Sequence, residues 1–235
     1  MFPDHIKLVK KIASNILLVN TYYPTSKSNK FKYTLYQIMT PFVKAHYKIF
    51  NILYPKSPWT SPVSILFFDK ALKNDMVGLE YGSGRSTLFF SKRIKKLVSI
   101  EHDEQWYKIV SKQLKENKIH NVDYFLFPKA DVPHSKADLD IYRNEHEEYE
   151  SKKAFKAYYN KVNDYSDDFF DFVIIDGRSR VRCGLNAIDK LKSKGIFVLD
   201  NSERERYNPL HEALSSWAKV NTTNGLTNTT IWVKP

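Results

Sequence analysis

The 235-residue chain is 42% hydrophobic and 14% aromatic, which is typical of a globular domain with a core and excludes a largely disordered protein. Its single cysteine, Cys183, excludes an internal disulfide, no apolar run reaches the length of a membrane span, and the first residues lack a secretory signal, so we expect a cytoplasmic protein. The formal net charge of +11 would suit a nucleic-acid partner, but the lysines are scattered along the chain as on solvated helix faces, so the charge by itself does not indicate one.

The first 57 residues are predicted to form an N-terminal helical extension. Apolar residues between Ile6 and Leu18 have helix-like spacing, and prolines punctuate the rest of this stretch at positions 24, 41 and 55. From residue 76 onward, short apolar runs alternate with amphipathic stretches. We therefore expect an extension at 1–57 and a second unit at 58–235.

Five apolar runs in the second unit are predicted strands, at residues 76–81, 97–100, 122–127, 170–175 and 195–199. Helices are predicted between and after them, one capped by Asp103, and two others carrying Val181, Leu185, Ile188 and Leu191, then Leu210, Leu214 and Trp217. A run at 229–233 after Gly225 predicts a final strand in a hairpin. Strands that alternate with helices predict an α/β fold, a doubly wound and mostly parallel sheet with helices on both faces.

Residues 129–168 interrupt this alternation with a charged, tyrosine-rich insertion. Its apolar positions could line one side of a long helix: Tyr142, Tyr149, Phe155, Tyr159 and Val162. One interpretation is an extra surface helix. The other is a cover for the substrate, because the insertion follows the carboxyl end of a strand, where ligands bind in this architecture.

A glycine-rich turn joins the first predicted strand to the next helix, with the sequence Glu80-Tyr81-Gly82-Ser83-Gly84-Arg85-Ser86-Thr87. Gly82 permits a tight turn, Gly84 lets the backbone approach a ligand, and the helix N-terminus offers unpaired N–H groups. A purely structural turn would have the same pattern, so the turn alone does not identify a ligand.

An acid at the end of the second strand makes the prediction more specific. Glu101 lies seventeen residues after Gly84, and a carboxylate there can accept both hydrogen bonds of a ribose diol. Dinucleotides and S-adenosylmethionine are both bound in this way. Thr87 stands in place of the third glycine of the dinucleotide fingerprint, and Glu80 precedes the first glycine by two residues, which together favour S-adenosylmethionine.

With these residues the chain resembles the class I S-adenosylmethionine-dependent methyltransferases over 58–235, including Ser99-Ile100-Glu101-His102-Asp103 and Ile174-Ile175-Asp176-Gly177. The resemblance implies a seven-stranded sheet with an antiparallel last strand. It also implies adenine packing near Phe127 and Pro128, and a lid that includes Pro58 and Trp59. The cofactor contacts that it implies are Glu80, Tyr81, Gly82, Ser83, Gly84, Ser86, Thr87, Glu101, His102 and Asp176.

Three polar side chains end the fourth and fifth predicted strands: Asp176, Asp200 and Asn201. Two carboxylates and an amide oxygen suit Mg²⁺ or Mn²⁺, and the set resembles that of metal-dependent O-methyltransferases of small molecules and sugars. Such a metal would bind two adjacent hydroxyls and lower the pKa of one. Two alternatives stay open, because Asp200 could cap a helix and Asp176 could be the base of a metal-free enzyme. The lysine that the catechol branch has three residues after the first aspartate is Ser179 here.

Five arginines follow the same two strands: Arg178, Arg180, Arg182, Arg204 and Arg206. Guanidinium groups bind carboxylates and phosphates in pairs of hydrogen bonds, so an anionic acceptor is one interpretation. Ion pairs with nearby acids such as Glu203 and Asp189 are the other. We assign the catalytic role to Asp176, Asp200 and Arg178.

The leading hypothesis is an O-methyltransferase that acts on a hydroxylated small molecule or glycan carrying a vicinal diol. A nucleic-acid methyltransferase is the alternative enzyme, although Asp176-Gly177-Arg178-Ser179 stands where enzymes that methylate exocyclic amines have an Asn/Asp-Pro-Pro-aromatic motif. A non-catalytic subunit that kept the fold is the third hypothesis. The acceptor, the position methylated and the oligomeric state stay open.

Overall fold

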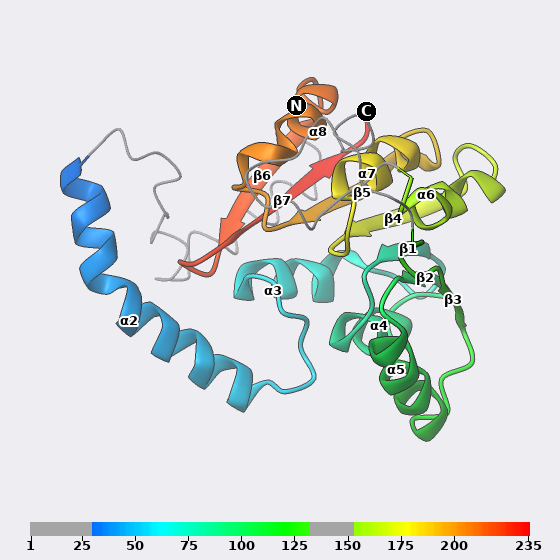
Figure 1. Ribbon diagram of the computed structural model, residues 1–235, viewed down its shortest axis with the longest axis horizontal. Helices are drawn as coiled ribbons and strands as arrows, with labels where there is room; N and C mark the ends of the chain where they lie inside the picture. The colour runs from blue at the N-terminus through cyan, green and yellow to red at the C-terminus, as the bar shows by residue number, and fades with distance from the viewer. Residues whose placement is uncertain (1–29, 132–152) are drawn as a thin grey trace.

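One seven-stranded sheet organises the molecule (Figure 1). The computed structural model describes residues 30–131 and 153–235. The strands are β1 (Val77–Tyr81), β2 (Lys96–Glu101), β3 (Val122–Leu126), β4 (Phe170–Ile175), β5 (Leu191–Asp200), β6 (Ala218–Thr223) and β7 (Asn228–Val233). Their order is β3-β2-β1-β4-β5-β7-β6, with β1 to β5 parallel to one another and β7 antiparallel to both β5 and β6. The predicted doubly wound sheet with an antiparallel last strand is confirmed.

The strand order creates a switch point between β1 and β4. After β1 the chain runs to β2 and β3 on one side, and it then returns to place β4 on the other side. The loops after β1 and β4 therefore diverge from neighbouring strand ends and leave a crevice at the carboxyl edge of the sheet. In open α/β sheets this is the place where ligands bind.

Helices cover both faces of the sheet, as predicted. On one face lie α3 (Pro62–Ala71) and α4 (Arg85–Ser91), and their phenylalanines pack on Phe172 and Ile174 of β4. On the other lie α6 (Lys156–Asn160), α7 (Arg180–Ala187) and α8 (Asn208–Ala213). The inward-facing residues of the central strands alternate between the two clusters, as the period of two along a strand requires.

Local caps explain where two of the helices begin. The Asp103 carboxylate accepts a hydrogen bond from the Trp106 backbone N–H at 2.7 Å, so α5 (Glu104–Glu116) starts where the sequence predicted a capped helix. The hydroxyl of Ser61 accepts from the Ser64 backbone N–H in the same way, and Pro62 occupies the first position of α3.

Two boundaries differ from the sequence prediction. Leu191, expected on a helix with Val181, is the first residue of β5, because α7 ends at Ala187 and Leu191 pairs with Phe170 across an irregular register between β4 and β5. Trp217 lies outside α8, which ends at Ala213, and the chain continues directly into β6. The expected C-terminal hairpin is the antiparallel pair of β6 and β7.

The predicted N-terminal helix at 6–18, and Tyr142 and Tyr149 of the predicted insertion helix, fall outside the described residues. Within the described part, α2 (Lys30–Leu53) precedes α3, and the insertion contributes α6 and the 3₁₀ helix η3 (Lys161–Asp164). A second 3₁₀ helix, η4 (Glu205–Tyr207), leads into α8. Among the described helices, none combines the length and hydrophobicity that a membrane span requires. The division at residue 57 stays a prediction.

Candidate functional site

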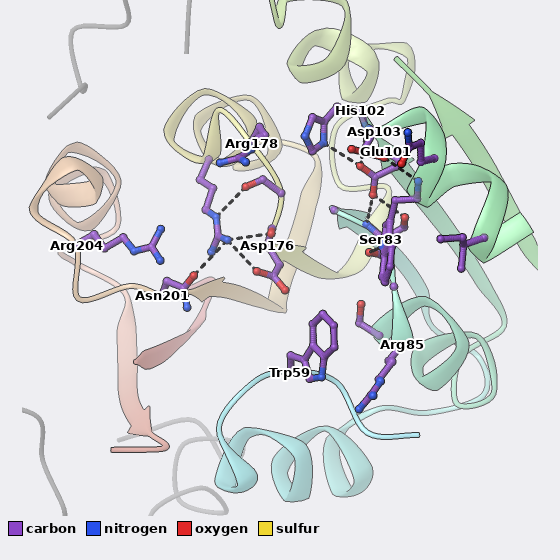
Figure 2. Close-up of a pocket in the computed structure, with 18 residues that line it drawn as sticks. Trp59, Ser83, Arg85, Glu101, His102, Asp103, Asp176, Arg178, Asn201 and Arg204 are labelled. Atoms are coloured by element: carbon purple, nitrogen blue, oxygen red, sulfur yellow. Dashed lines mark hydrogen bonds and ion pairs between the residues drawn. The ribbon is translucent and has the colours of Figure 1, made fainter. Parts of the chain in front are cut away.

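A cavity of about 630 Å³ opens at the carboxyl edge of the sheet, above the switch point between β1 and β4 (Figure 2). Its walls come from the glycine-rich turn, the end of β2 and the start of α5, the loop after β4, and the loop after β5. The polar and aromatic residues that line it include Trp59, Ser83, Arg85, Glu101, His102, Asp103, Trp106, Asp176, Arg178, Arg180, Asn201 and Arg204. The fold thus brings together, at one cavity, residues that lie more than a hundred positions apart.

Two glycines in contact form the floor between β1 and β4. Gly82 has φ +89°, and a Cβ on it would lie 2.6 Å from the backbone N and Cα of Gly177. The Gly82 N–H donates to the carbonyl of Ile100 at 2.9 Å, which fixes the turn against β2. A side chain at residue 82 would therefore need both a strained backbone and a shift of the β4 loop.

Glu101 lies at the centre of the turn's hydrogen bonds. One carboxylate oxygen accepts from the backbone N–H of Ser83 at 2.8 Å and from its hydroxyl at 2.6 Å. The other accepts from the backbone N–H groups of His102 and Asp103 at 2.7 and 2.9 Å, and His102 Nδ1 lies 2.8 Å away. Burial acts to raise the pKa of Glu101, but the hydrogen bonds outweigh it and lower the pKa to about 2. The carboxylate is therefore charged and fixed in place.

Glu80 is fully buried beneath the turn and does not line the cavity. One of its carboxylate oxygens accepts from the hydroxyls of Thr87 and Ser99 at 2.6 and 2.7 Å, while the other is buried without a hydrogen-bond partner. Burial raises the pKa of Glu80 to about 7, an effect that the hydrogen bonds only partly oppose. Thr87 in turn accepts from the Gly84 backbone N–H at 2.9 Å, so Glu80 positions the turn from below.

Aromatic rings form one wall of the cavity. Trp59 and Trp106 stack with ring centroids 6.4 Å apart, and the Arg85 guanidinium lies 5.0 Å from the centroid of the Trp59 ring. Trp59 is 54% exposed and lines the cavity together with the polar side chains. A large exposed ring of this kind offers a flat apolar surface to a ligand.

The acids after β4 and β5 are held by one buried arginine. Arg180, at the start of α7, donates from Nη2 to the Asp176 carboxylate and backbone carbonyl, both at 2.9 Å, and to Asn201 Oδ1 at 3.4 Å (Figure 2). Its Nη1 donates to the backbone carbonyl of Asp200, and its Nε to that of Gly177 at 3.0 Å. The guanidinium thus ties together the ends of two neighbouring strands.

Asp176, whose side chain is 26% exposed, and the buried Asp200 form a pair of carboxyl groups beside this guanidinium. The Asp200 carboxylate accepts from the Thr229 hydroxyl of β7 at 2.7 Å. Burial, and then the nearby Asp176 carboxylate, raise the pKa of Asp200 to about 7. Burial also raises the pKa of Asp176, against the opposing charge of Arg180.

The expected Mg²⁺ or Mn²⁺ site does not fit this arrangement. Two of the three expected ligands, Asp176 and Asn201, direct oxygens at one guanidinium nitrogen, and the third, Asp200, points toward Thr229. A hard cation needs those oxygens at about 2.1 Å from its own centre, where the positive charge of Arg180 already lies. Within residues 30–131 and 153–235, no cluster of three or more His, Cys, Asp or Glu side chains is placed to hold a metal.

The arginine cluster divides into two groups. Arg178, Arg180 and Arg204 line the cavity, whereas Arg182 and Arg206 lie over tyrosine rings of the fold, at 5.7 Å from the centroid of Tyr159 and 5.1 Å from that of Tyr207. Arg204 is 3.9 Å from Glu203, so the ion-pair interpretation holds in part for it. The sequence pattern did not distinguish the three arginines that line the cavity from Arg182 and Arg206.

A second cavity of about 300 Å³ shares Trp59, Asp176 and Asn201 with the first. Its other walls are Tyr47 from α2, Asp200, and three residues of the β6–β7 hairpin loop: Asn224, Leu226 and Thr227. Sequence reasoning missed Tyr47 and the hairpin residues. No local signal marked them, because they reach the site only through the antiparallel placement of β7 and the packing of α2.

The predicted cofactor residues take different places. Gly82, Ser83, Gly84, Ser86, Glu101, His102 and Asp176 line the larger cavity, while Glu80, Tyr81 and Thr87 are buried behind it. Of the two predicted catalytic partners of Asp176, Arg178 lines the larger cavity and Asp200 the smaller. Phe127 packs against the core and donates its backbone N–H to the carbonyl of Glu101 at 2.8 Å, and the adenine contact expected there stays a prediction.

No protein-family model and no curated protein sequence matches the chain. Solved structures do. A methyltransferase-like protein from Silicibacter pomeroyi is 19% identical with a TM-score of 0.53, over 76% of this chain and 88% of that one. A candidate methyltransferase from Streptococcus mutans in complex with SAH is 12% identical with a TM-score of 0.52, over 76% and 100%. A candidate caffeoyl-CoA O-methyltransferase from Staphylococcus aureus is 12% identical with a TM-score of 0.51, over 89% and 100%.

The chain has the class I methyltransferase fold. The methyltransferase fold expected from the glycine-rich turn, Glu101 and Asp176 is thereby confirmed. Structures that share the fold are described as acting on acceptors as different as caffeoyl-CoA and ribosomal RNA, so the fold by itself does not select the acceptor.

Proposed function

We propose that the protein transfers a methyl group from S-adenosylmethionine to a hydroxyl group of a small molecule or glycan. The observation that carries the proposal is the larger cavity, where the glycine-rich turn and Glu101 face Asp176 across the β1/β4 switch point. The cofactor half of the proposal is supported by the structural similarity to a methyltransferase in complex with SAH. The cavity is also large enough for a drug-sized or nucleoside ligand.

The nucleoside end of the donor would lie at Glu101. Its carboxylate is charged and fixed, but Ser83 Oγ and the His102 ring occupy one position on each oxygen. Both are side chains that can rotate away, whereas the three backbone donors stay. A ribose diol would then replace them with two hydrogen bonds of the same geometry.

The acceptor would occupy the smaller cavity, which meets the larger one at Asp176 and Trp59. Besides the carboxyl groups of Asp176 and Asp200, the donors and acceptors on its walls are the Tyr47 hydroxyl, the amides of Asn201 and Asn224, and the hydroxyl of Thr227. An aromatic face beside several neutral hydrogen-bonding groups suits a polyhydroxylated ligand such as a sugar. The arginines on the larger cavity would bind an anionic group if the acceptor carries one.

Asp176 is the proposed general base. The donor would supply an electrophilic methyl group on its sulfonium. Arg180 holds one carboxylate oxygen of Asp176 at 2.9 Å, which leaves the other oxygen to accept a proton from the acceptor hydroxyl. As the hydroxyl oxygen forms its bond to the methyl carbon, the carbon–sulfur bond breaks, and the products are the methyl ether, protonated Asp176 and S-adenosylhomocysteine. Alignment of oxygen and methyl group by the two cavities contributes to the rate.

Calorimetry with S-adenosylhomocysteine tests the proposal. The wild-type protein should bind it, and Glu101→Gln should bind at least about tenfold more weakly, because the hydrogen bonds to the ribose lose their charge assistance. Glu116→Gln is the control, since it removes the same charge from the exposed face of α5. A folded wild-type protein that binds neither S-adenosylmethionine nor S-adenosylhomocysteine would rule out the enzyme.

A labelled-methyl screen then tests the acceptor. Diol-bearing sugars and phenols should accept methyl groups, and Asp176→Asn should abolish the transfer while S-adenosylhomocysteine still binds. Ribosomal and transfer RNA form the other arm of the screen, because the net charge of +11 would suit them. Methylation of RNA but of no hydroxylated small molecule would replace the proposed acceptor class.

A further inference from the structure

The geometry points to Arg180 as the resident cation of the acceptor site: its guanidinium occupies the position of a divalent metal between Asp176 and Asn201, and the protein works without one. This assignment rests on the function proposed above and identifies the positive charge that lies beside Asp176 and Asp200. Its test measures metal binding and does not depend on turnover.

The first support is the place of the guanidinium. Nη2 of Arg180 is within hydrogen-bond distance of oxygens from both strand ends, Asp176 Oδ1 at 2.9 Å and Asn201 Oδ1 at 3.4 Å. In the resemblance drawn from the sequence, these same oxygens are metal ligands. Here one positively charged nitrogen contacts both oxygens, and dashed lines in Figure 2 mark these contacts to Asp176 and Asn201.

The second support is that Arg180 is built into this position. Its side chain is 8% exposed, and each of its three nitrogens donates to a backbone carbonyl of the two loops, those of Gly177, Asp176 and Asp200. The Tyr207 ring lies 5.7 Å from the guanidinium carbon and is itself buried. An arginine with this many fixed partners cannot swing out to admit an ion without breaking the loops that carry the ligands.

The third support is local and comes from the chain around Arg180. It is the first residue of α7, and the residue before it, Ser179, has φ +47°. A non-glycine residue in the left-handed region is uncommon and costs conformational energy, which the contacts of Arg180 offset. Arg180 follows directly on this turn, and its side chain donates to the Gly177 and Asp176 carbonyls of the β4 loop.

These contacts determine what the arrangement does chemically. A metal would neutralise the acids and bind the acceptor oxygens directly. Arg180 supplies a single positive charge and has its hydrogens committed to protein oxygens, so it orients Asp176 and leaves acceptor binding to the neighbouring side chains. Arg180 is therefore a positioning residue, and acceptor recognition depends on hydrogen bonds from the cavity walls.

Removal of the guanidinium should open a metal site. In Arg180→Met the side-chain oxygens of Asp176 and Asn201 lose their positive partner, and rotation of the Asp200 carboxylate away from Thr229 would complete a set of three oxygen ligands that suits Mn²⁺. We expect one saturable Mn²⁺ site per chain by electron paramagnetic resonance titration in this variant and none in the wild type. Arg180→Lys keeps the charge and should bind no Mn²⁺.

Arg204→Met is the matched control, because it removes a positive charge from the same cavity without opening the oxygen cluster. Arg204→Met should bind no Mn²⁺. If it binds Mn²⁺ as Arg180→Met does, the loss of one positive charge from the cavity, and not the opening of the oxygen cluster, would explain the binding. One tight Mn²⁺ or Mg²⁺ site in the wild type that is lost in Asp176→Asn would overturn the inference. If Arg180→Met does not fold, as circular dichroism would show, the wild-type titration still decides between a metal site and none.

Discussion

Gly82→Ala tests whether the contact between the β1 and β4 loops holds the site together. A Cβ at this residue would meet the backbone of Gly177 at 2.6 Å and the carbonyl carbon of Asp176 at 2.8 Å, and alanine would also have to adopt φ +89°. The backbone strain costs about 1–3 kcal/mol and the overpacking another 1–3 kcal/mol. We expect the free energy of unfolding to fall by about 2–6 kcal/mol. For a chain of this size that lowers Tm by roughly 4–24 °C.

The same substitution should also displace Asp176, since the new methyl group pushes against the backbone that carries it. S-adenosylhomocysteine affinity should therefore fall together with stability, as measured by calorimetry and by urea denaturation on one preparation. Gly84→Ala is the control two residues away. Its φ of 165° is extended, its Cβ would lie 3.5 Å from Trp106 Nε1, and its unfolding free energy should change by less than about 1 kcal/mol. Equal loss of stability in both variants would refute the reasoning.

Three other substitutions test the charges and the aromatic wall of the site. The pKa of Glu80 is raised to about 7 from its usual 4.5, so its contribution to stability is fully present below about pH 4.5 and is lost as the pH rises to about 7. Glu80→Gln should therefore reduce the fall in unfolding free energy between pH 4.5 and pH 8. An unchanged fall would contradict the assignment. The lowered pKa of Glu101, about 2, has the opposite sign: its contribution is present above about pH 4.5 and is lost as the pH falls toward 2, so Glu101→Gln should flatten the acid limb of the unfolding curve. Trp59→Ala should leave Tm nearly unchanged, because the ring is half exposed, but it should weaken ligand binding several-fold. Trp59→Phe should retain part of the affinity. Wild-type affinity in Trp59→Ala would show that the ring does not contact the ligand.

Much of the fold and half of the site were predictable from local patterns. The apolar runs, the glycine-rich turn and the Asp103 cap each depend on a few consecutive residues, and such signals do not need the rest of the chain. The rule that parallel strands end at one edge of the sheet then placed Asp176 on the same cavity as Glu101 without further information.

The tertiary structure alone decided what occupies the space between those residues. Arg180 looked like one of five equivalent arginines, and only the turn at Ser179 and the approach of β5 to β4 direct it onto Asp176 and Asn201 in place of a metal. Tyr47 and Thr227 reach the smaller cavity from segments about 180 residues apart in sequence. Long-range packing of this kind has no local period or spacing, because it depends on how whole elements lie against one another, and a sequence pattern records only neighbours along the chain.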